Sequence, residues 1–459
     1  MRPCPAALKR IRAFVLGRPA YIVPGTVGDE DRKLAVELGI PLLGPSPEIS
    51  GALNKKSAAR ALFRAAEVNV APGAPVLPES FYHQQNEGGG GMFADYARGK
   101  DGWRPRGAAG GGEHDGGDGG DGGEFSGGER IGDEGGEQEE YDEVMALAGL
   151  HDGGVYGGAT ELLREVPPYG DTDPCFDVVE VLARLAVAHP SVSRWIMKVD
   201  DESGGRGHAF LDVSGIGELQ GVLRKAADAL AAMGLGEGGL WGETGGNNNG
   251  SGSGNNGGSQ EEGWAFLAGD RRVDDALRSH CAVAAAILRR AIASRVSIAA
   301  PSAYGGSGSW PRFYAQMMRR GGVVEACPES VTGSPSVNLF IAPTGDVHVL
   351  ATHEQIFCPA YRFVGASFPQ SSVPHAALAA AATAVGEAAA RAGVSGFVGV
   401  DFVVVRDDGG TGGLRLWAVD LNVRPTCTQA SFDLFHFVAG GSFDPSTGTY
   451  AIASGRALP

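Results

Sequence analysis

The chain has 459 residues, a formal net charge of −16 and 74 glycines. An acidic chain without a block of lysine or arginine is a poor candidate for nonspecific DNA binding, because phosphate neutralisation needs clustered positive charge. A local RNA-binding groove stays open. No apolar run approaches the roughly 18 residues that indicate a membrane span, and the N-terminus is unlike a signal peptide. We therefore expect a cytoplasmic protein without a membrane partner.

The predicted elements begin with a short strand, a helix and a second strand. The strands are YIVPG and IPLLGP, and the helix between them is Asp29–Leu38, which Gly39 ends. This order at this spacing predicts a parallel pair, the usual unit of α/β sheets. We interpret residues 1–51 as a partial βαβ unit, and we expect a further helix at 54–68.

The composition then changes twice. Residues 84–140 consist largely of Gly, Asp and Glu, and residues 242–262 of Gly, Asn and Ser. Such segments cannot offset their ordering entropy, so we expect two disordered insertions. Ordered patterns resume after each, and we expect one main domain at 52–440 and a C-terminal tail at 441–459. Helices are predicted at 175–188, 217–233, 273–295, 374–392 and 431–438, and strands at 195–199, 323–327, 336–343, 346–352, 397–405 and 414–423.

The first candidate site lies in RWIMKVDDESGGRGHAFLDV. A predicted strand delivers Lys198, and a loop follows with Gly204, Gly205 and Gly207. Glycines allow backbone amides to approach a phosphate closely, and the lysine adds a point charge for the same phosphate. The alternative is a plain hairpin with a flexible tip. His208, beside the loop, is a candidate general base, or else a loop-exposed histidine without a role.

The second candidate site lies in the segments GFVGVDFVVV and LRLWAVDLNVRP. Asp401 sits in the middle of one predicted strand, while Asp420 and Asn422 lie two apart on the next and so share a face. Carboxylates among apolar residues need positive compensation. Mg²⁺ fits, because it completes its shell with waters and ATP phosphates. The alternatives are a solvated sheet edge, or backbone amides around Asp401. Arg424 would hold a phosphate or an acyl-phosphate, or else lies on the surface.

A third pattern is the strand that ends in Glu325-Ala326-Cys327-Pro328. A strand that ends in Glu-x-x-Pro can form the hinge against which an adenine ring lies. The alternative is a core strand with a polar end.

These three pieces, in this order, resemble the ATP-grasp superfamily. The resemblance implies an α/β protein of the α+β ATP-grasp type, with a short N-terminal parallel βαβ pre-ATP-grasp unit and two subdomains that clasp nucleotide. Carried over residue by residue, it assigns the ATP phosphates to Lys56 (with Lys55 as a substitute), Lys198, Gly204, Gly205 and Gly207, adenine to Glu325 and the backbone of Cys327, Mg²⁺ to Asp401, Asp420 and Asn422, and catalysis to Lys198 and Arg424.

Within that superfamily the chain resembles the C-terminal region of the IQ motif-containing protein H family, on stretches such as AYIVPG, IPLLGPSPEIS and GGVVEACPESVT. Asp420 departs from the Glu that most ATP-grasp enzymes have there. The calmodulin-binding IQ motif is incomplete, because the partial match that begins at Leu219 has Ala229 where the motif ends in a basic residue. We interpret this stretch as an amphipathic core helix. Calmodulin is therefore implied only for longer relatives, of which we expect this chain to be a shortened version. The resemblance also implies an association with cilia.

Two functions follow from the resemblance. In the first, ATP phosphorylates a carboxylate, and an amine or a thiol attacks the acyl-phosphate, while Mg²⁺ and Lys198 offset the charge on the phosphoryl oxygens. In the second, the fold keeps ATP but has lost ligase chemistry, and it serves as a scaffold or adaptor associated with calmodulin or RNA. A third interpretation is an α/β domain that binds no nucleotide.

Overall fold

The computed structural model describes residues 4–78, 177–202, 204–233, 271–301, 309–358, 361–406, 414–452 and 457–458. All of them belong to one compact unit. The predicted insertions at 84–140 and 242–262 lie outside the described residues.

The N-terminal segment forms four helices, α1 (Pro5–Val15), α2 (Asp29–Leu38), α3 (Pro47–Leu53) and α4 (Lys56–Ala65). The predicted helix α2 is confirmed with its bounds. The predicted parallel pair is present only as one isolated parallel bridge between Ile22 and Leu42. Proline lacks the N–H group that a ladder needs, and Pro24 lies two residues after Ile22 while Pro41 directly precedes Leu42. The pairing therefore stops after a single step.

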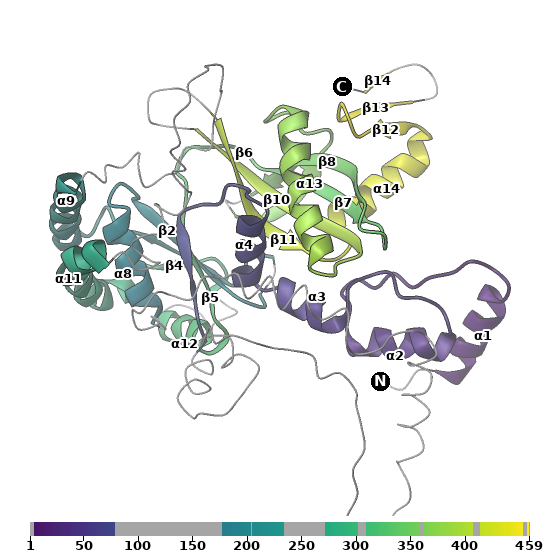
Figure 1. Cartoon of the computed structure of the whole chain (residues 1–459), viewed down its shortest axis with the longest axis horizontal. Helices are drawn as coiled ribbons and strands as arrows, with labels where there is room; N and C mark the ends of the chain where they lie inside the picture. Colours follow the sequence, from purple (N-terminus) through teal and green to yellow (C-terminus); the bar gives the residue numbers. More distant parts are fainter. Residues whose placement is uncertain are drawn as a thin grey trace, which may run out of the picture. The chain divides into compact units, whose positions relative to one another are not determined.

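The first sheet has the strand order β1-β5-β2-β3-β4, with every ladder antiparallel. Its strands are β1 (Gly73–Val76), β2 (Arg194–Val199), β3 (His208–Asp212), β4 (Ser297–Ile298) and β5 (Gly322–Ala326). One face carries Trp195, Met197 and Leu211, which are fully buried in a core with four helices. Those helices are α8 (Val178–Ala188), α9 (Gly217–Ala232), α11 (Arg271–Arg295) and α12 (Trp310–Arg320) (Figure 1). The opposite face carries Lys198 and Glu325.

The second sheet has the order β11-β10-β7-β8-β9, and β6 pairs with β10. Its strands are β6 (Val331–Gly333), β7 (Pro335–Ile341), β8 (Val347–Phe357), β9 (Phe363–Ser367), β10 (Gly396–Arg406) and β11 (Leu414–Asn422). One face packs against α13 (His375–Arg391) and against α4 (Figure 1). Val337, Leu339 and Val400 are fully buried in this second core, together with Leu62 of α4.

The segment predicted as a C-terminal tail has regular structure. After α14 (Cys427–Ala439) come three short antiparallel strands, β12 (Ser442–Asp444), β13 (Thr449–Ala451) and β14 (Ala457–Leu458). Aromatic rings hold them to the rest of the unit. The ring of Tyr450 is fully buried, and its centroid lies 4.8 Å from that of Phe435 on α14 and 6.2 Å from that of Phe368.

Helix α9 contains the incomplete IQ motif. Leu219, Leu223, Ala226 and Leu230 form its buried side, so the stretch is the amphipathic core helix that the sequence predicts. Its apolar face is already covered by the first core. Among the described residues, no helix is long and apolar enough to cross a membrane.

Candidate functional site

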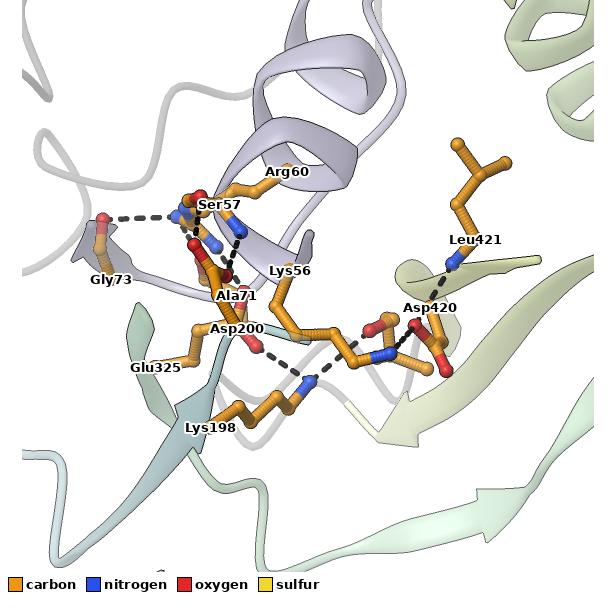
Figure 2. A network of polar contacts seen from close by, with 11 residues as sticks. Lys56, Ser57, Arg60, Ala71, Gly73, Lys198, Asp200, Glu325, Asp420 and Leu421 are labelled. Carbon is orange, nitrogen blue, oxygen red and sulfur yellow. Dashed lines mark hydrogen bonds and ion pairs between the residues drawn. The ribbon is translucent and has the colours of Figure 1, made fainter. Parts of the chain in front are cut away.

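Helix α4 begins beside the ends of strands from both sheets, and its first turn provides the site with a cation. Lys56 is its first residue, and the Nζ atom lies 2.5 Å from Oδ1 of Asp420 on β11 (Figure 2). The Lys56 side chain is 10% exposed. Lys55 precedes the helix and is exposed. Of the two lysines that the sequence offers, Lys56 is therefore the one that reaches the predicted metal ligands.

Lys198 reaches the same place from the first sheet. Its Nζ atom lies 2.8 Å from Oε2 of Glu325 and donates a hydrogen bond of 3.1 Å to the carbonyl oxygen of Val419 (Figure 2). Val419 is an extra residue in β11, because Asp420 pairs with Asp401 while Ala418 pairs with the next residue of β10. This β-bulge turns one carbonyl towards Lys198. Lys198 thus lies beside the residue that precedes Asp420.

Glu325 holds two cations. Besides Lys198, its carboxylate binds Arg60 of α4 through an ion pair of 2.6 Å between Nη1 and Oε1. Arg60 also donates to the carbonyl oxygens of Ala71 and Gly73, at 2.6 and 3.0 Å. Burial alone would raise the pKa of the Glu325 carboxyl, but Lys198 and Arg60 hold that pKa below its ordinary value. Glu325 is therefore ionised, and both of its carboxylate oxygens are already in ion pairs. A contact between this carboxylate and adenine would compete with those two ion pairs.

The predicted metal ligands meet on neighbouring strands. Asp401 and Asp420 are register partners, and the Asn422 amide nitrogen lies 3.4 Å from Oδ2 of Asp401. Ser336 donates a hydrogen bond of 2.7 Å to the other Asp401 oxygen. Burial and the negative charge of Asp420 raise the pKa of Asp401 to about 6. Register partners lie side by side on one face of the sheet, and two such carboxylates suit a divalent cation.

The Asn422 side chain is turned away from that role. Its oxygen accepts a hydrogen bond of 2.9 Å from Nη2 of Arg424, while its nitrogen faces Asp401. A rotation of the amide would present the oxygen to the carboxylates. In the described part of the chain, no three His, Cys, Asp or Glu side chains gather as metal ligands. A cation here would therefore depend on two carboxylates, the Asn422 amide, water and phosphate oxygens.

Two glycines of the loop after β2 have a backbone conformation that other residues rarely adopt. Gly204 and Gly205 both have left-handed φ values, 64° and 74°, which favour glycine. A Cβ atom on Gly205 would lie 3.2 Å from the carbonyl oxygen of Tyr361. At Gly207 it would lie 2.5 Å from Cβ of Glu202. Residue 203 lies outside the described residues. A larger side chain at either glycine would displace the loop from its neighbours.

His208 is not the exposed loop residue that one alternative predicts. It is the first residue of β3 and pairs with Lys198 across the ladder. Burial and the positive charge of Lys198 lower the pKa of its imidazole to about 3, so the ring is neutral at pH 7. Its Nδ1 atom is buried and has no hydrogen-bond partner among the described residues.

Cys327 lies in a small apolar group with Ile196 and Phe210. The ring of Tyr361 packs against this group, with its centroid 4.3 Å from that of Phe210 and its hydroxyl 3.1 Å from the Cys327 sulfur. The backbone N–H of Cys327 donates to the carbonyl oxygen of Arg194 at 2.8 Å. The Cys327 N–H is therefore engaged, so the predicted backbone contact with adenine would depend on the Cys327 carbonyl oxygen.

Sequence patterns miss three residues of this site, Arg60, Asp200 and Tyr361. Arg60 and Asp200 act through partners 265 and 143 positions away in the chain. Tyr361 is a single aromatic residue outside any apolar pattern. Lys56, Lys198, Glu325, Asp401, Asp420, Asn422 and Arg424 do come together, as the sequence predicts, while their binding roles stay predictions.

Comparisons with known proteins match the sequence of this chain to a family. A family model described as "IQCH-like, ATP-grasp" matches residues 167–232 and 284–446. The IQ motif-containing protein H of Danio rerio is 22% identical over 448 residues, which cover 96% of this chain and 29% of that protein. The chain thus spans less than a third of the length of this relative.

Solved structures give weaker likenesses. The biotin carboxylase domain of Hydrogenobacter thermophilus 2-oxoglutarate carboxylase, in complex with MgADP, ADP and bicarbonate, is 11% identical, with a TM-score of 0.39 over 98% of this chain and 57% of that one. The D-alanyl-alanine synthetase A of Vibrio cholerae is 8% identical, with a TM-score of 0.35 over 90% of this chain and 71% of that one. Scores this low carry no argument, so the ATP-grasp fold assignment depends on the family match and on the chain's own two sheets.

Proposed function

Because this chain belongs to the IQCH-like, ATP-grasp family, we propose that it binds Mg-ATP and uses it to activate a carboxylate for attack by an amine or a thiol. One observation carries the proposal. The Lys56 ammonium lies 2.5 Å from Asp420, and Lys198 binds the carbonyl of the residue just before it. Cations suited to phosphates and carboxylates suited to a metal thus belong to one cluster. We call Lys56, Lys198, Asp401, Asp420 and Asn422 the site cluster.

The two lysines suit the nucleotide phosphates for different reasons. Lys198 is 8% exposed and is held by Glu325, so its ammonium is fixed before any ligand arrives. A charge placed in advance in a desolvated site needs little reorganisation when negative charge develops. Lys56 has only Asp420 as its ion-pair partner among the described residues. We expect it to exchange that carboxylate for a phosphate oxygen when Mg²⁺ takes its place.

The carboxylates suit the metal because they repel each other. Asp401 and Asp420 face each other across the ladder, and the pKa of Asp401 is raised to about 6. A cation would relieve that repulsion. Bound there, Mg²⁺ would offset the charge of the phosphates and orient them. Asp401, Asp420 and, after rotation of its amide, Asn422 would hold it.

The proposed reaction has two steps. A carboxylate oxygen of the substrate attacks the γ-phosphorus of ATP, the bond to the bridging oxygen breaks, and ADP leaves. An amine or a thiol then attacks the carbonyl carbon of the acyl-phosphate, and inorganic phosphate leaves. The residues of the chain would position the reacting groups and neutralise the charge of the phosphates. Lys198 would lie by the transferred group, and Arg424, fixed by its bond to Asn422, would hold the carboxylate or the acyl-phosphate.

Calorimetric titration with Mg-ATP tests the binding. We expect the wild type to bind and Lys198→Ala to bind at least tenfold more weakly, because charge-assisted contacts to phosphate contribute about 1.5–3 kcal/mol. Asp401→Asn should remove the dependence on Mg²⁺. Lys225→Ala, an exposed lysine of α9, is the matched control and should bind like the wild type. Equal affinities for wild type and Lys198→Ala would rule out the assigned site.

A nucleotide-binding scaffold without transfer is the second candidate. It is favoured by the Asp at position 420, whose short side chain is already engaged by Lys56. This reading predicts Mg-ATP binding without release of ADP across a panel of carboxylates, amines and thiols. ADP release that needs both a carboxylate and an amine or thiol would exclude it.

A further inference from the structure

The first turn of α4 is capped by a residue from a distant part of the chain. Asp200 follows β2, and its carboxylate accepts two hydrogen bonds from Ser57, one of 3.0 Å from the backbone N–H and one of 2.6 Å from the hydroxyl (Figure 2). Lys55, at the N-cap position, provides no side-chain cap. The N–H groups of a first turn have no partners within the helix. Asp200 therefore supplies, from the first sheet, the cap that the helix's own sequence lacks.

Asp200 is itself held rigidly. It is 3% exposed, and its backbone N–H donates a hydrogen bond of 3.1 Å to the carbonyl oxygen of Gly321. Gly321 has a φ of 80°, and a Cβ atom there would lie 2.9 Å from the carbonyl oxygen of Val76. The backbone of the first sheet thus fixes the position of the Asp200 carboxylate. A carboxylate at a helix N-terminus is also favoured by the helix dipole.

The helix that Asp200 caps is packed against the other sheet. Leu62 and Phe63 of α4 belong to the core of the second sheet. Ser57, which binds Asp200, is the covalent neighbour of Lys56, which binds Asp420. The start of the helix is therefore fixed by Asp200 of the first sheet's loop, while its first side chain, Lys56, binds Asp420 of the second sheet. Any displacement of this turn moves the Lys56 ammonium relative to Asp420.

We propose that Asp200 is a positioning residue, which holds the first turn of α4 so that Lys56 binds Asp420 in the nucleotide-free protein and a phosphate of ATP in the complex. This inference rests on the proposed function for its role with ATP. Asp200 acts through Ser57 and Lys56. A direct contact between its carboxylate and a phosphate would be repulsive.

A double-mutant cycle on Mg-ATP affinity separates this role from a merely structural one. We expect Asp200→Ala to weaken Mg-ATP binding between about twofold and thirtyfold, because a helix cap contributes about 0.5–2 kcal/mol and the bound state needs the turn that this cap holds. In a Lys56→Ala background the same change should have no further effect, because the residue through which Asp200 acts is gone. An equal loss in both backgrounds would overturn the proposal.

Conservative variants keep the test informative if Asp200→Ala does not fold. Asp200→Asn retains an oxygen that accepts one of the two bonds from Ser57, and Ser57→Ala retains the backbone bond. Both should lose part of the affinity. Asp201→Asn is the matched control, since Asp201 is exposed and its φ of 63° suits asparagine. It should bind like the wild type, and a loss equal to that of Asp200→Asn would contradict the proposal.

Hydrogen exchange distinguishes failure of this inference from failure of the proposed function. In nucleotide-free protein, Asp200→Ala and Asp200→Asn should speed exchange in a peptide that spans the first turn of α4, whereas Asp201→Asn should not. If the wild type binds no Mg-ATP, the proposed function fails, and the cycle between Asp200 and Lys56 is measured by urea unfolding instead. A measurable coupling there supports positioning. No coupling, or unchanged exchange, overturns it.

Discussion

Two charged groups lie on either side of α4 and are built on opposite principles. On the first sheet, one carboxylate, Glu325, is shared by Lys198 and Arg60. On the second sheet, two carboxylates, Asp401 and Asp420, face each other, and Lys56 binds Asp420. The pKa of Glu325 is held low, and that of Asp401 is raised to about 6.

The difference shows how one site can combine rigidity with affinity for a cation. A buried carboxylate with two cations is fully compensated, so it fixes the side chains around it. Two neighbouring carboxylates with too little positive charge around them repel each other, and a bound cation would reduce that repulsion. The first group therefore resembles a structural anchor, whereas the second has the excess of negative charge that attracts a cation. Each of the following changes alters one side of this comparison.

Removal of the anchor should have the largest effect. Glu325→Ala leaves Lys198 and Arg60 buried without their carboxylate, and we expect a loss of about 3–5 kcal/mol in the free energy of unfolding. Urea denaturation measures this loss. Glu218→Ala is the matched control, because Glu218 pairs with Arg290 at 3.0 Å but is 74% exposed, and it should cost at most about 1 kcal/mol. Similar losses at the two positions would mean that burial does not set the strength of the anchor.

The repelling pair should reveal itself in the pH dependence of stability. The pKa of Asp401 is raised from 3.8 to about 6 in the folded chain, so the folded state binds this proton more tightly than the unfolded state does. The contribution of Asp401 to the free energy of unfolding therefore falls as the pH rises through that window, by at most about 2–3 kcal/mol.

Asp401→Asn should abolish this fall, which denaturation across a pH series would detect. Asp228→Asn, at an exposed carboxylate of α9, should leave it unchanged. A wild-type slope that persists in Asp401→Asn would assign the proton to another group.

A smaller effect is expected where β10 approaches Thr426, the N-cap residue of α14. A Cβ atom on Gly399 would lie 2.5 Å from Cγ2 of Thr426. We expect Gly399→Ala to cost about 1–2 kcal/mol, in the lower part of the range for overpacking, because the atom it meets is a terminal methyl group. Thr426→Ser removes that methyl but keeps the hydroxyl that caps α14, so it should restore stability in the double variant. A double variant as unstable as Gly399→Ala would mean that the contact is not the cause.

The second group could be predicted from sequence because its geometry is local. Two neighbouring strands with polar residues at alternate positions bring Asp401, Asp420 and Asn422 to one face. The first group could not be predicted in this way. Arg60 and Glu325 are 265 positions apart, and no period or spacing links an arginine on a helix to a carboxylate that distant. The sequence motif suggested adenine for Glu325, whereas in the structure its carboxylate binds Lys198 and Arg60.

Secondary structure could likewise be predicted where the apolar pattern is local and regular, and not elsewhere. The predicted helices at 217–233 and 374–392 and the strands at 195–199 and 397–405 are all present within one or two residues of their bounds, because each has a clear apolar period. Helix α12 was not predicted, although Trp310, Phe313 and Met317 have helical spacing. The three strands after α14 are only two or three residues long, too short for alternation to distinguish them from a loop.

Val419 shows how an irregularity in one ladder serves another part of the molecule. Without this residue, β11 would pair evenly with β10, and Asp420 would still stand opposite Asp401. The strand thus has one residue more than its own pairing needs. Its carbonyl goes to Lys198, and its side chain packs against the core of the first sheet. The ladder between β10 and β11 is irregular at this one step. In return, the hydrogen bond from Lys198 to the Val419 carbonyl oxygen joins the first sheet to the second beside Asp420.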